Sequence, residues 1–115
     1  MRGVRTQEEI MSWPNDADGD VFRRLEASGF DFRRQYSIDY NVDFDAWPPD
    51  PAALKVLRER FGDIELFPPG DESVGSVLFK VIGHVTYESV TSMQRSVTNA
   101  MRPYGGVCES WGVLH

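Results

Sequence analysis

The sequence predicts an α+β fold: a ferredoxin-like sandwich with a four-stranded antiparallel sheet, helices on one face of it, and an extra N-terminal helix. Residues 36–44 alternate apolar and polar side chains, which is the period of a strand with one buried face. After the first expected helix, the elements run strand, helix, strand, strand, helix, strand, and two such crossovers most economically build this sandwich. The 115 residues fit one domain, 1–115, in which residues 1–15 form a loosely ordered arm.

The N-terminal region contains two helix signals. Thr6 and Glu9 have the spacing of a capping box, which favours a short helix before Pro14 breaks it. A longer helix is expected over about residues 17–28, because acidic residues ahead of it supply N-caps and Gly29 is a natural stop.

The first strand, residues 36–44, ends at a Trp-Pro-Pro run. A second helix begins after Asp50, which is an N-cap followed by a proline at the first helical position, and Gly62 ends it. A short strand over residues 64–67 follows, and a Pro-Pro-Gly turn stops it.

The second long strand, residues 76–86, carries apolar side chains on both faces, which indicates a central position in the sheet. A third helix over about residues 88–103 has apolar side chains at helical spacing and ends at Gly105-Gly106. Residues 107–114 form the last strand. The first and third strands are the middle strands of a ferredoxin-like sheet, and here they are the longest.

Acidic residues outnumber Lys and Arg, 18 to 12, giving a formal net charge of −6. Residues 1–50 hold 11 acidic and 6 basic residues, whereas residues 51–115 hold 7 and 6. An acidic domain repels phosphate backbones and attracts basic proteins. The strand at residues 77–81 also lacks the glycine and aromatic signature of RNA-binding sheets. We therefore expect a protein partner and no direct nucleic-acid binding.

Cys108 is the single cysteine, which excludes an internal disulfide and a disulfide-built secreted scaffold. Residues 1–11 carry scattered charges instead of the apolar run of a signal peptide. No stretch approaches the roughly 18 apolar residues of a membrane span. The sequence therefore favours a cytoplasmic protein without membrane contact.

Cys108 and His84 invite a second hypothesis, a small Cys/His enzyme. A catalytic cysteine needs a nearby base and a lowered pKa, whereas Cys108 lies in an expected strand, where a small buried hydrophobe is typical. His115 is the only other histidine, so ligands at zinc spacing are missing. We predict no catalytic residue and no metal site.

Asp16, Asp18 and Asp20 resemble the start of a calcium loop, but the glycine and glutamate required at its sixth and twelfth positions are absent. Helix capping explains these acidic residues better. Gly105-Gly106 is a helix stop and not a phosphate loop, which would precede a helix and contain a lysine. No cofactor is expected.

Asp39 and Asp43 project from the polar face of the first strand, with Asn41 between them. Residues four apart on a strand are about 13 Å apart, too far for a catalytic carboxylate pair. These side chains therefore predict a solvated or partner-facing acidic surface. Trp111 has two interpretations: a core anchor, which general burial tendencies favour, or a hot spot of an interface.

Three segments resemble the family of regulator of ribonuclease E activity B (RraB), the ribonuclease E inhibitors. They are residues 20–29, 38–44 and 104–112, which read DVFRRLEASG, IDYNVDF and YGGVCESWG. The resemblance implies the ferredoxin-like fold and a non-catalytic role, since family members bind ribonuclease E and damp its RNA cleavage. Glu109 and Ser110 depart from the Asp-Gly that often precedes the tryptophan, and the chain stops at His115 without the long acidic tail of some members.

The leading hypothesis is a regulator that binds a nuclease and does not catalyse a reaction, with ribonuclease E as the candidate partner. The candidate partner-binding residues are Asp39, Asn41, Asp43, Glu109 and Trp111. A general interaction or dimerisation module is a third hypothesis, in which edge strands or the open face of the sheet pair two copies.

Overall fold

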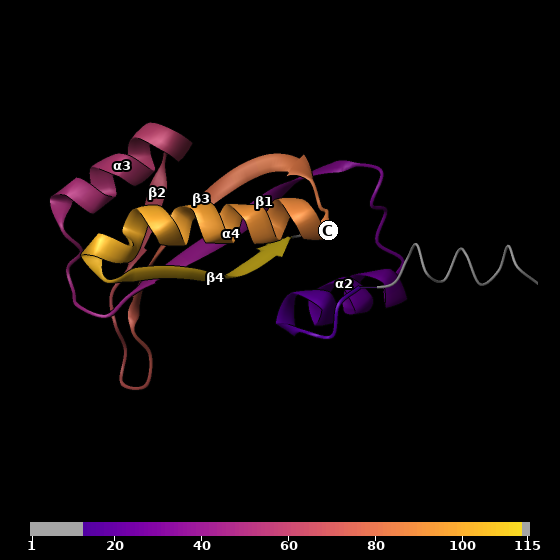
Figure 1. Ribbon diagram of the computed structural model, residues 1–115, viewed down its shortest axis with the longest axis horizontal. Helices are drawn as coiled ribbons and strands as arrows, with labels where there is room; N and C mark the ends of the chain where they lie inside the picture. The colour runs from indigo at the N-terminus through magenta and orange to yellow at the C-terminus, as the bar shows by residue number, and fades with distance from the viewer. Residues whose placement is uncertain (1–12, 114–115) are drawn as a thin grey trace, which may run out of the picture.

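The computed structural model describes residues 13–113, and Figure 1 shows their arrangement. The expected capping-box helix at residues 6–9, and most of the arm expected at residues 1–15, lie outside the described residues. The elements are α2 (Ala17–Ala27), β1 (Gln35–Phe44), α3 (Pro51–Phe61), β2 (Ile64–Phe67), β3 (Gly75–His84), α4 (Tyr87–Met101), the 3₁₀ helix η1 (Arg102–Tyr104) and β4 (Gly106–Val113).

The four strands form one antiparallel sheet in the order β2-β3-β1-β4. The middle strands β1 and β3 are the longest, at 10 residues each. With the crossovers through α3 and α4, this order is the ferredoxin-like arrangement. The predicted α+β sandwich and its two middle strands are therefore confirmed.

The core lies between the two crossover helices and one face of the sheet. Alternate residues of β1, from Ile38 to Phe44, are buried, as the period of two predicts. One cluster contains Ile38, Tyr40, Val42 and Phe44 of β1, Val77 and Phe79 of β3, Ala53 and Leu57 of α3, and Val90, Val97 and Met101 of α4. Because both helices contribute to this cluster, they cover the same face of the sheet. The opposite face is called the open face below.

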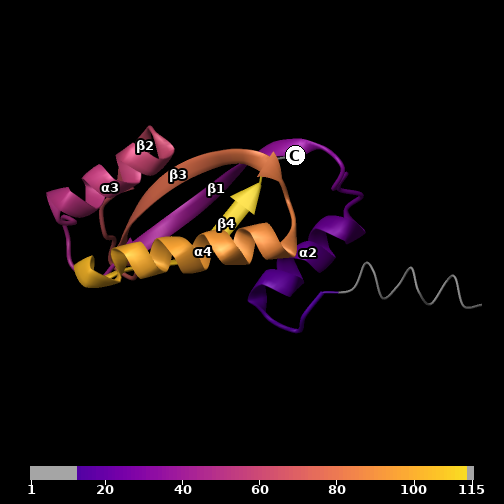
Figure 2. The same cartoon turned by 45° about the horizontal axis from the view of Figure 1, so that its top comes forward.

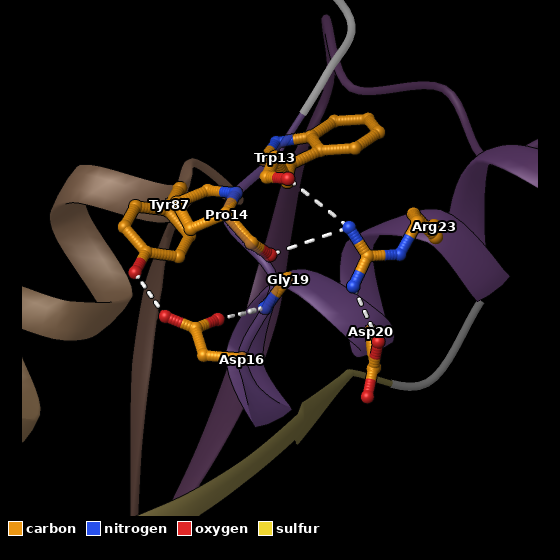
Figure 3. Close-up of polar contacts among 7 residues, drawn as sticks. All are labelled: Trp13, Pro14, Asp16, Gly19, Asp20, Arg23 and Tyr87. Carbon is orange, nitrogen blue, oxygen red and sulfur yellow. Dashed lines mark hydrogen bonds and ion pairs between the residues drawn. The ribbon is translucent and has the colours of Figure 1, made fainter.

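The helix α2 lies outside this plan, beyond the end of the sandwich where α4 begins (Figures 1 and 2). Asp16 is its N-cap, and its carboxylate accepts hydrogen bonds from the Gly19 N–H at 2.7 Å and the Tyr87 hydroxyl at 2.6 Å (Figure 3). Arg23 donates a hydrogen bond to the carbonyl oxygen of Trp13 at 3.0 Å, so the segment before α2 is held against the helix.

Two boundaries differ by two residues from those expected, and the other differences are of one residue. The third helix ends as an α-helix at Met101 and continues as η1, because Pro103 has no N–H for a further α-helical hydrogen bond. Gly105 follows in the left-handed region, at φ 74°, and ends the turn as predicted. β3 ends at His84, two residues early, since the chain must turn there so that Thr86 can cap α4.

Candidate protein-binding face

Three of the predicted partner-binding residues lie together on the open face. Asp39, Asn41 and Asp43 alternate with buried residues along β1, so their side chains point away from the helices. All three are half-buried by the neighbouring strands. The period of two, read from the sequence, was sufficient to group them.

The charge of Asp39 is compensated within the sheet. Lys80 lies directly opposite it on β3, and the Lys80 Nζ is 3.1 Å from the Asp39 Oδ1. Cross-strand pairs of opposite charge stabilise a sheet by a few tenths of a kcal/mol, up to about 1 kcal/mol. Asp39 therefore has a structural partner already and is the less available of the two aspartates.

Asp43 has a different environment. A bulge in β4 shifts the register between Asn41 and Val42 and leaves Glu109 as the extra, exposed residue. Partial burial raises the pKa of Asp43, and the nearby carboxylate of Glu109 raises that pKa further. Within residues 13–113, no Lys or Arg forms an ion pair with either carboxylate. The two residues therefore form a negative pair without an ion-pair partner, and Arg102 is the basic residue that lines a hollow with both of them.

Trp111 is placed in the core and not on the open face. It is 9% exposed, and its ring centroid lies 5.3 Å from that of Phe22 in α2. Its Nε1 donates a hydrogen bond to the Asp18 Oδ1 at 2.9 Å, and the buried Gln94 also donates to that carboxylate, at 3.3 Å. This geometry agrees with the core-anchor interpretation: Trp111 holds α2 against β4.

Beside Asp43, the open face is hollowed where the loop between β2 and β3 meets the strands. We call this feature, of about 600 Å³, the hairpin hollow. It is lined by Asn41, Asp43, Phe67, Pro68, Glu72, Ser73, Val74, Ser76 and Ser110. A second hollow of about 560 Å³ adjoins it, and Asp43 and Val74 line both.

Phe67 and Val74 were not among the predicted site residues. They are 45% and 54% exposed, which is unusual for large apolar side chains next to each other. The available signal was the alternation of side chains along the strand. Phe67 is the last residue of β2, three places after Ile64, which faces the core, so Phe67 falls on the opposite, open face.

The thiol-enzyme hypothesis finds no support in the geometry. Cys108 is buried, and burial raises the pKa of its thiol to about 12, which leaves almost no thiolate near neutral pH. His84 pairs with Gln35 and Cys108 with Val42, so seven residues of β1, about 23 Å, separate them. The exposed His84 instead hydrogen bonds through its Nε2 to the carbonyl oxygen of Arg33 at 3.1 Å.

The acidic residues around α2 serve the helix. Asp16 caps it, Asp18 accepts from Trp111, and Asp20 pairs with Arg23 one turn on. In the part of the chain that the structure describes, no group of three or more His, Cys, Asp or Glu side chains is arranged to hold a metal ion. No helix among residues 13–113 is long and apolar enough to span a membrane.

Comparison with protein families bears on the leading hypothesis. The family model described as regulator of ribonuclease activity B (RraB) matches residues 15–113, which include every described element from α2 to β4. The chain belongs to the RraB family. Membership implies that the protein regulates ribonuclease activity and is a non-catalytic inhibitor, in agreement with the leading hypothesis. A search among curated proteins finds no match.

Proposed function

We propose that this RraB-family protein restrains ribonuclease E by binding it through the open face of the sheet. The observation that carries the proposal is the carboxylate pair of Asp43 and Glu109, which has no ion-pair partner among residues 13–113 and lies beside Asn41 at the β4 edge of the open face. Asp39 contributes at the margin of this face, since Lys80 already neutralises it.

Electrostatic complementarity supports the partner class. Nuclease segments that bind RNA carry Lys and Arg, because they must neutralise phosphates. An acidic face that docks on such a segment competes with RNA for the same positive charges, so inhibition requires no catalytic group. Attraction between exposed charges weakens as salt is added, and the proposed binding should therefore be salt-dependent.

The test is calorimetric titration of the chain against the non-catalytic C-terminal region of ribonuclease E, at two salt concentrations. We expect a Kd on the order of 1 μM or tighter at low salt. Asp43→Lys combined with Glu109→Lys should weaken binding by about tenfold or more, and should reduce its salt dependence, because two attractive charges become repulsive.

The matched control combines Glu26→Lys with Glu59→Lys, which makes the same change in net charge at exposed positions of α2 and α3, away from the open face. It should leave the Kd within about twofold, apart from the general effect of net charge. If the Asp43/Glu109 variant and the control bind alike, the open face is not the interface. If the native chain shows no binding at low salt, ribonuclease E is not the target.

A further inference from the structure

We propose that the hairpin hollow anchors a short, extended segment of the partner that carries an Arg or Lys side chain next to an apolar one. The inference rests on the proposed function and deepens it, because it specifies the chemistry of the segment that is bound. Three observations support it: exposed apolar side chains, polar side chains without hydrogen-bond partners in the chain, and acidic side chains without ion-pair partners among the described residues.

The walls of the hollow are apolar and open to solvent. Phe67 and Val74 are 45% and 54% exposed, and Pro68 lies beside them. The loop that carries Pro68 and Val74 extends past the strands (Figure 1), so a partner reaches it without displacing any described element. Aromatic side chains near the centre of an interface contribute disproportionately to binding, and Phe67 is the exposed aromatic residue placed to do so.

The floor of the hollow offers free hydrogen-bonding groups. Asn41, Ser76 and Ser110 line it, from three neighbouring strands. Among residues 13–113, none of these three side chains hydrogen bonds to another protein group, although each is able to donate and accept. They are therefore available to the backbone amides of an extended segment.

Charge decides which occupant fits. Asp43 and Glu72 line the hairpin hollow, and no Lys or Arg does. The adjoining hollow holds Glu109 together with Arg102. A second copy of this chain would bring the same acidic patch against itself in a two-fold dimer, and the net charge of −6 would add to that repulsion. A segment with Arg or Lys instead places its cation at Asp43 and Glu72, with its methylene groups against Phe67.

The size of the hollow favours a segment over a folded surface. A volume of about 600 Å³ lies within the range of pockets that hold small ligands, so it has room for a few side chains. The segment then contacts both parts of the hollow: its apolar side chain packs on Phe67 and Val74, and the neighbouring cation lies against the acidic side chains. The proposed anchor is thus a basic and apolar pair of residues within a flexible region.

The experiment compares three serine variants in the calorimetric titration against the ribonuclease E fragment. Phe67→Ser and Val74→Ser should each weaken binding by about tenfold, which is typical for exposed side chains at a hot spot. Ile82→Ser is the matched control, because Ile82 is 69% exposed on the same face but lies at the far end of β3. It should leave the Kd within about twofold.

Peptide probes test the hollow without the nuclease. The isotope-labelled chain is titrated with an eight-residue peptide, GSLRLRSG, and with two matched peptides in which the Leu residues become Ser or the Arg residues become Glu. We expect NMR shift changes at residues 41–43, 67–76 and 110 for the first peptide, and at least tenfold weaker binding for the other two.

The outcomes separate the inference from the function on which it rests. If charge reversal at Asp43 and Glu109 weakens nuclease binding but the Phe67 and Val74 variants match Ile82→Ser, the anchor is wrong and the proposed function stands. If the nuclease fragment does not bind, shifts confined to the hollow by the first peptide still support the anchor, and their absence overturns it. Light scattering tests the alternative occupant, a second copy of the chain. If the molar mass doubles as the protein concentration rises, and Phe67→Ser returns it to that of one chain, a second copy occupies the hollow and the proposed anchor is overturned.

Discussion

Asp43 combines a cost in stability with the role in binding that we propose for it. It sits on β1 with a half-buried carboxylate, and burial together with Glu109 raises its pKa. A raised pKa means that the folded state disfavours the charged form, so ionised Asp43 destabilises the folded chain near neutral pH. Residues selected for binding are commonly retained at such a cost.

Asp43→Asn should therefore raise the free energy of unfolding at pH 7 by about 0.5 kcal/mol while weakening partner binding. The gain should shrink as the pH falls through the folded-state pKa of Asp43, and vanish below the unfolded-state pKa, because the native carboxyl is then protonated in both states. Urea denaturation at a series of pH values measures this. A variant that is less stable than the native chain at pH 7 would contradict the assignment.

At the scale of elements, α4 protects an edge of the sheet. β4 is an edge strand, and edge strands expose backbone groups that invite pairing with another chain. The hydroxyl of Thr98 in α4 accepts a hydrogen bond from the Cys108 N–H at 2.8 Å and donates one to the Cys108 carbonyl oxygen at 3.3 Å. This side chain substitutes for a neighbouring strand, so pairing of two copies through β4 is blocked at Cys108.

Thr98→Val keeps the shape of the side chain and removes both hydrogen bonds. It should lower the free energy of unfolding by about 1 kcal/mol, because two partly buried backbone groups lose their partner. Thr91→Val is the control within the same helix, since the Thr91 hydroxyl donates to carbonyl oxygens of its own helix, those of Tyr87 at 2.8 Å and Glu88 at 3.3 Å, and not to the strand. Equal effects of the two variants in urea denaturation would argue against edge protection.

At the scale of the whole molecule, the question is whether α2 belongs to the cooperative unit. It adds nothing to the ferredoxin-like plan, yet Phe22 and Leu25 enter the main core cluster. Polar contacts reinforce this docking: Trp111 and Gln94 both donate to Asp18, and Tyr87 donates to Asp16. The helix is therefore attached to both α4 and β4, and its loss would expose Trp111.

We accordingly expect unfolding in a single transition. Far-UV circular dichroism, which reports all helices, and tryptophan fluorescence, which reports the surroundings of Trp111 among others, should give the same midpoint in urea. A fluorescence transition that precedes the loss of helix signal would show that α2 detaches first. In that event α2 would be an accessory element, and the Trp111–Asp18 hydrogen bond would contribute little to global stability.

The sequence by itself determined the order of elements, their approximate bounds and the grouping of Asp39, Asn41 and Asp43 on one face. These features depend on local rules: a strand alternates its side chains, and a cap or a glycine ends a helix within one turn. The family resemblance, carried by three short segments, agreed with the family match over residues 15–113.

The tertiary structure alone decided which of these residues are available. Asp39 is neutralised by Lys80, 41 positions away, and Trp111 is anchored by Asp18, 93 positions away. The hairpin hollow likewise depends on strand register and on the bulge that exposes Glu109. Local periodicity assigns a side chain to a face, but the register between distant strands decides what lies opposite it, and no local pattern encodes that pairing.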